Sequence, residues 1–131
     1  MTKFLTLLVI ATASIATLTP VKAATNAEFM RMLAETGCNS KYSDGKKADL
    51  FDANYKNKSM TVTGEIATLS DNDTSLKVLS STLTFDVIIG FADPKAGYDL
   101  EKGQRITVTF NVTSAGGCFL SYRGDHGVIV H

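Results

Sequence analysis

The chain has 131 residues, a length typical of one domain, and 44% of them are apolar, which excludes an intrinsically disordered chain. Its 13 basic side chains balance 13 acidic ones, so the formal net charge is zero. Nucleic-acid binding draws much of its affinity from a cationic surface, and polybasic contact with a membrane needs the same feature. We therefore expect no nucleic-acid partner and no electrostatic membrane contact.

The N-terminus has the three parts of a secretory signal peptide over residues 1–23. Lys3 supplies the positive start, an apolar run follows, and compact residues precede a cleavage point between Ala23 and Ala24. The apolar run is shorter than a bilayer span, so an uncleaved anchor is the weaker alternative. Loss of Lys3 and Lys22 would leave 11 basic against 13 acidic side chains. We expect a periplasmic or secreted protein with no membrane insertion after cleavage.

A short amphipathic helix is predicted after the cleavage point. Over residues 26–36, Phe29, Met32 and Leu33 recur at helical spacing, and Gly37 ends the pattern. Thr25, with a glutamate three residues later, has the spacing of a capping box at the helix start.

A second helix is predicted over residues 46–54, with Ser43 or Asp44 as its N-cap. The two helices place residues 24–56 in a helical N-terminal segment. This segment and the strands that follow form one domain, residues 24–131.

Residues 60–69 alternate apolar and polar side chains, the pattern of a strand with one face on a core and one in water. Gly64, in the middle, predicts a bulge or a sharp bend. Similar patterns predict strands at residues 75–80, 83–91 and 104–113, and a last strand in two parts, 118–123 and 128–130. Five short strands with glycines at bends fit a closed antiparallel barrel, which has no exposed edge. We predict a mainly β fold with the barrel over residues 57–131.

Cys38 and Cys118 both follow the predicted signal peptide. In an oxidising compartment two cysteines allow one intramolecular pair, and we predict a structural disulfide between them. Closure of a loop of about 80 residues would contribute roughly 4.5 kcal/mol in the chain-entropy model. A redox pair and a metal site are disfavoured, because the sequence has no Cys-x-x-Cys spacing and its two histidines lie at the far end.

Two stretches resemble the tRNA_anti-like family of OB-fold domains. Residues 55–66 (Tyr-Lys-Asn-Lys-Ser-Met-Thr-Val-Thr-Gly-Glu-Ile) are similar to the family's opening strand, and residues 100–108 carry the Lys-Gly-x-x-hydrophobic lead-in to its fourth strand. The resemblance covers about residues 48–130 and implies a five-stranded, OB-fold-like antiparallel barrel. The family name implies nucleic acid, but stacking platforms need exposed aromatic side chains flanked by cations. The strand faces opposite the core are polar instead: Thr61, Thr63, Glu65, Thr107, Thr109 and Asn111.

Three short motifs could carry chemistry, and each has a simpler explanation. Arg123-Gly-Asp125 matches the tripeptide of integrin ligands, but a polar hairpin within the last strand is the favoured explanation of so short a match. Asp125 with His126 and His131 offers too few convergent ligands for a metal. Ser114 or Ser121 paired with His126 lacks a nucleophile elbow. We therefore expect no catalytic residue, no metal, no cofactor and no enzymatic activity.

OB-folds bind through their second and third strands and the loops that join strands one–two and four–five. These loops correspond here to residues 70–75 and 114–117. The candidate ligand-binding residues are Lys77, Asp86, Tyr122 and Arg123. Tyr122 and Arg123 lead this set because Tyr and Arg are enriched at interaction hot spots.

We expect a monomeric, exported OB-fold binding module whose polar strand face and loops hold a small or oligomeric ligand, such as a saccharide or peptide. The alternative is a protein-interaction module, for example an inhibitor, an immunity factor or a subunit of an envelope assembly. The ligand or envelope partner is not specified by the sequence. Ordinary solvated surface remains the simplest explanation of each candidate residue.

Overall fold

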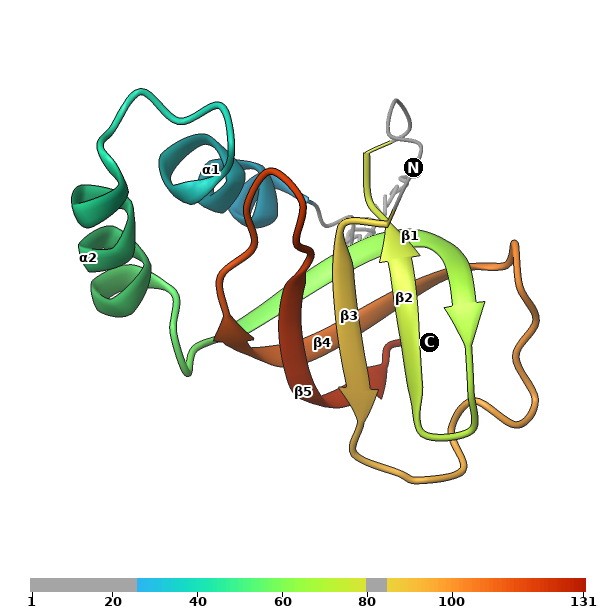
Figure 1. Ribbon diagram of the computed structural model, residues 1–131. Helices are drawn as coiled ribbons and strands as arrows, with labels where there is room; N and C mark the ends of the chain where they lie inside the picture. The colour runs from blue at the N-terminus through green and yellow to red at the C-terminus, as the bar shows by residue number, and fades with distance from the viewer. Residues whose placement is uncertain (1–25, 80–84) are drawn as a thin grey trace, which may run out of the picture.

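The computed structural model describes residues 26–79 and 85–131, which form two helices and a closed five-stranded barrel (Figure 1). The predicted signal peptide and Thr25 lie outside the described residues. The elements are α1 (Ala27–Thr36), α2 (Asp44–Asn54), β1 (Ser59–Leu69), β2 (Asp73–Lys77), β3 (Val87–Phe91), β4 (Arg105–Ser114) and β5 (Tyr122–Ile129). The mainly β, OB-fold-like architecture is therefore confirmed.

The barrel closes in the order β1-β2-β3-β5-β4. Four of the five strand pairs are antiparallel, and β3 with β5 is parallel. The prediction of an all-antiparallel barrel was wrong at this pair, and the reason is geometric. Strand directions that alternate around a closed ring need an even number of strands, so a ring of five must contain a parallel pair.

Strand β1 links the two halves of the barrel by changing partners along its length. Its first part, Ser59–Glu65, pairs with β4, and its second part, from Glu65 onward, pairs with β2. Gly64 lies at this crossing point, where a Cβ atom would stand 2.6 Å from the Lys77 carbonyl oxygen. The predicted irregularity exists, but the register shift falls between Ile66 and Thr68, and Gly64 serves the close approach of β2.

Strand β5 is continuous, so the predicted hairpin at residues 123–127 was wrong. Gly124 lies against the Phe110 ring, and a Cβ on Gly127 would stand 2.6 Å from Ile89 Cγ2. These glycines let β5 pack closely on its neighbours. His126 has a φ of 55°, and the β4–β5 register shifts between Thr109 and Asn111, as in a bulge. Gly124 and Gly127 therefore mark close contacts between strands and not a turn.

The helices close one end of the barrel. Phe29 and Met32 of α1 and Phe51 of α2 are buried with the inward-facing strand residues in one core. Asn26 fastens the start of α1 to β1, because its side-chain amide donates to the Thr63 carbonyl (3.0 Å) and accepts from the Thr63 N–H (2.8 Å).

The start of α2 tests a predicted N-cap, whereas the capping box predicted at Thr25 lies outside the described residues. Ser43 caps α2 by accepting a hydrogen bond from the Lys46 N–H, as predicted. Asn26 occupies the N-cap position of α1, and no side-chain cap bond is present there. Its amide is used for the contact with β1 instead.

The predicted disulfide is present between Cys38 and Cys118, which are 80 positions apart. It joins the segment after α1 to the loop between β4 and β5. A disulfide is compatible with an extracellular or periplasmic location. Within residues 26–79 and 85–131, no helix has the length and hydropathy needed to cross a membrane.

Candidate functional site

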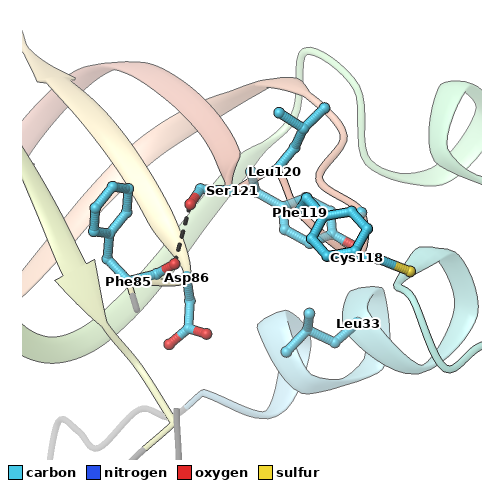
Figure 2. A pocket seen from close by; sticks show the side chains of 9 residues that line it. Leu33, Phe85, Asp86, Cys118, Phe119, Leu120 and Ser121 are labelled. Atoms are coloured by element: carbon cyan, nitrogen blue, oxygen red, sulfur yellow. Dashed lines mark hydrogen bonds between the residues drawn. The ribbon is translucent and has the colours of Figure 1, made fainter. Parts of the chain in front are cut away.

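A hollow of about 420 Å³ opens at the helix-covered end of the barrel, between α1, the start of β3 and the β4–β5 loop (residues 115–121). In Figure 2, Phe85 and Asp86 lie on its strand side, and Leu33, Cys118 and Phe119 lie on its helix side. Gly117, Leu120, Ser121 and Tyr122 complete the lining. We call this feature the loop-end hollow.

The β4–β5 loop presents two apolar side chains to solvent beside the loop-end hollow. Phe119 is 97% exposed and Leu120 is 73% exposed. Large apolar side chains normally lose solvent contact on folding, because exposure of their surface to water is unfavourable. Adjacent exposed apolar residues at the rim of a hollow are typical of an interaction surface.

Two contacts hold this loop to the rest of the domain, and a third joins two residues within the loop. The disulfide joins Cys118 to Cys38, and the Ser121 hydroxyl donates to the Phe85 carbonyl at 3.0 Å (Figure 2). Gly117 N–H donates to the Leu120 carbonyl at 2.9 Å and so forms a tight turn around Phe119. The exposed side chains therefore stand on a braced loop, which lowers the entropy cost of binding.

Asp86, a predicted ligand residue, lines the loop-end hollow and also joins two strands. Its carboxylate Oδ2 accepts hydrogen bonds from Val78 N–H (2.6 Å) and Leu79 N–H (2.9 Å) just past the end of β2. Its carbonyl accepts from Tyr122 N–H at 3.0 Å. Among the described residues that line the hollow, Asp86 alone carries a charge.

Tyr122, one of the two leading predicted residues, lines the hollow but is buried, with 3% of its surface exposed. Its ring packs edge-on against Phe29 at 5.8 Å between centroids, and its hydroxyl lies 2.7 Å from Thr36 Oγ1. Burial raises the pKa of the Tyr122 phenol, and the hydrogen bond with Thr36 opposes this rise. Its main contacts are therefore in the core and not on an open binding surface.

The other two predicted residues lie apart from this hollow. Lys77 lines a separate hollow with Glu65, Val78 and Arg105, and Arg123 is exposed on β5. Of the four candidates, the structure brings together only Asp86 and Tyr122.

The two predicted binding loops lie at opposite ends of the barrel. The β1–β2 turn is at the lower end in Figure 1, whereas the β4–β5 loop rises beside α1 at the upper end. Of the loop predicted at residues 114–117, Gly117 contributes to the loop-end hollow. Residues 70–75 do not line it.

The polar strand face uses part of its hydrogen-bonding capacity internally. Thr61 Oγ1 lies 2.7 Å from Thr109 Oγ1, and Thr63 Oγ1 lies 2.7 Å from Thr107 Oγ1. Each pair uses one of its two hydroxyl protons, as cross-strand threonines commonly do. This face therefore has fewer donors to offer a saccharide than its sequence suggests.

Asp125 and His126 meet outside the hollow, where His126 Nδ1 lies 2.8 Å from Asp125 Oδ1 at an exposed position. Over the described ranges, no group of three or more His, Cys, Asp and Glu side chains is arranged to hold a metal ion.

Leu33, Phe119 and Leu120 were not predicted as site residues. Residues 118–123 were predicted to form a strand, in which Phe119 and Leu120 would face opposite sides. Two neighbouring large apolar residues break the period of two, and a glycine pair precedes Cys118. That break was the available signal for an exposed apolar loop.

Comparisons of the chain with protein-family models, with curated proteins and with solved structures give no match. The resemblance to tRNA_anti-like domains stays a prediction, and its fold component agrees with the barrel that the structure contains.

Proposed function

We propose that this chain is an exported, non-catalytic binding module that captures its ligand at the loop-end hollow, with the OB-fold-like barrel as a rigid scaffold. The observation that carries the proposal is Phe119, a phenyl side chain 97% exposed at the rim of the hollow on a disulfide-braced loop. Burial of a phenylalanine or leucine side chain contributes about 1.5–3 kcal/mol each. A ligand that covers both Phe119 and Leu120 would therefore gain about 3–6 kcal/mol from their burial, before the cost of association.

Export is supported by the signal-peptide pattern of residues 1–23 and by the disulfide, which persists in oxidising compartments. The binding role is supported by the position of the hollow, because the loop between strands four and five is a common ligand contact in OB-folds. Asp86 holds the ends of β2 and β3 together, which fixes the shape of the hollow.

The test is capture of ligands from the protein's native envelope extract by three immobilised forms: the unchanged chain, Phe119→Asp and Tyr98→Asp. Tyr98 is the matched control, because it is 70% exposed and lies outside the loop-end hollow. We expect one ligand, protein or small molecule, to be retained by the unchanged chain and by Tyr98→Asp and lost with Phe119→Asp. Equal retention by all three forms would overturn the proposal.

A further inference from the structure

We propose that the ligand of the loop-end hollow is a short exposed segment of another protein, in which an apolar side chain stands next to a basic one. This inference rests on the proposed function and names its partner. The apolar side chain would enter the hollow beside Phe119 and Leu120, and the basic side chain would lie against Asp86.

The charge of the hollow indicates which charge its partner should carry. Among the described residues of its lining, Asp86 carries the only charge, and that charge is negative. Both backbone hydrogen bonds of this carboxylate go to Oδ2, and the group is only partly buried. A cation is favoured beside such a group, whereas a carboxylate or phosphate would bring a second negative charge into a hollow with apolar walls. Anionic lipids, fatty acids and nucleotides therefore fit this site poorly.

The shape of the surface favours a protein segment over a small molecule. Phe119 and Leu120 line the hollow, yet they are 97% and 73% exposed, so a small molecule held inside the hollow would leave much of their apolar surface in contact with water. A partner with its own surface can cover the projecting side chains and fill the hollow at the same time. Only such a partner removes the whole apolar rim from water.

The size of the surface disfavours a second copy of this chain. An aromatic side chain buries about 150–250 Å² on binding, so Phe119 and Leu120 together offer roughly half of the about 800 Å² that each partner contributes to a standard interface. A stable dimer would need a further exposed apolar area beside the loop. The apolar area that Phe119 and Leu120 offer is enough to contact one short segment of a partner protein.

The test selects peptides from a phage-displayed random library on the purified protein, after removal of phage that bind Phe119→Asp. We expect the enriched peptides to share an aromatic or long aliphatic residue next to Lys or Arg. Replacement of that basic residue by Glu should weaken binding by at least about tenfold. The inference is overturned if no sequence is enriched, or if the enriched peptides lack a basic residue or bind equally well with Glu.

Two protein variants test the role of the carboxylate. Asp86→Asn keeps an oxygen that can accept the Val78 and Leu79 N–H groups but removes the charge, and it should weaken binding of the basic peptides by about tenfold. The matched control is Asp93→Asn, because Asp93 also accepts a backbone N–H, from Lys95, but lies outside the hollow. The charge reversal in the peptide gives the same information if Asp86→Asn does not fold.

Failure of this inference differs from failure of the proposed function. If Phe119→Asp loses a small molecule from the envelope extract, the binding module stands and the protein-segment partner is wrong. If Phe119→Asp loses nothing from the extract, both fail.

Discussion

Phe119 and Tyr122 are three positions apart, yet their aromatic rings have opposite environments. Phe119 is 97% exposed, whereas Tyr122 is 3% exposed and packs against Phe29. Tyr122 therefore ties the start of β5 into the core, and Phe119 projects from the loop that this tie holds in place. Tyr122 contributes to the stability of the domain, whereas Phe119 belongs to the proposed binding surface. Substitutions at the two positions should therefore have different effects.

Substitution of Phe119 should leave the fold intact. Phe119→Ser removes no core contact, so the free energy of unfolding should change by no more than about 0.5 kcal/mol. Tyr122→Ala, in contrast, should cost about 3–5 kcal/mol because it leaves a cavity among buried rings. Urea unfolding of both variants checks this. A large loss of stability with Phe119→Ser would mean that the loop is part of the core.

High pH should destabilise the domain through its buried phenols. Burial is the main cause that raises the pKa of Tyr122, and of Tyr55, above 10.0. The native state therefore favours the neutral phenol, and this contribution to stability is complete below pH 10 and is lost as the pH rises through the folded pKa. Tyr122→Phe cannot ionise at this position, so its stability should fall less steeply above pH 10. Parallel slopes for the variant and the unchanged chain in urea titrations would contradict this.

Reduction of the disulfide should destabilise the domain. A thiol reductant that opens Cys38–Cys118 should lower the free energy of unfolding by about 2–5 kcal/mol, because the unfolded chain regains the freedom of a long loop. The double variant Cys38→Ser with Cys118→Ser is the control and should not respond to the reductant. Equal stability of the oxidised and reduced protein would show that the bond does not brace the loop.

The close packing of β5 on β4 predicts a strong effect at one glycine. Gly124→Ala places a methyl group against the Phe110 ring, and such overpacking costs about 1–3 kcal/mol. Gly117→Ala is the matched control, because an added Cβ atom there meets no heavy atom within 4 Å apart from its own residue and its two chain neighbours. The temperatures of thermal unfolding should separate the two variants, and a neutral Gly124→Ala would show that β5 can shift away from β4.

Much of the fold was predictable because the spacing of apolar residues indicates which segments form helices and which form strands. The apolar spacing of residues 26–36 and 60–69 reflects packing on one core, and both the helix and the strand are present. The parallel β3–β5 pair was missed because strand patterns do not state direction, although the odd number of strands in a closed ring requires such a pair. The hairpin in β5 was wrong because glycine marks both turns and close backbone contacts, and the sequence does not distinguish them.

The site was less predictable than the fold. Asp86 was predicted, but its bonds to Val78 and Leu79 depend on how β2 and β3 end, which is a tertiary feature. Tyr122 was expected at a binding surface because tyrosine is frequent there, yet its burial depends on a helix that lies far away in the sequence. Phe119 was missed because an exposed loop residue does not belong to the repeating apolar pattern of a helix or strand.

The most direct test of the binding site is photo-crosslinking in cells that produce the protein, with p-benzoylphenylalanine in place of Phe119 or, as the control, in place of exposed Tyr98. We predict that the probe at position 119 forms one discrete adduct with a ligand and that the probe at position 98 does not form it. The absence of an adduct at position 119, or the same adducts at both positions, would contradict the assignment of the loop-end hollow as the binding site.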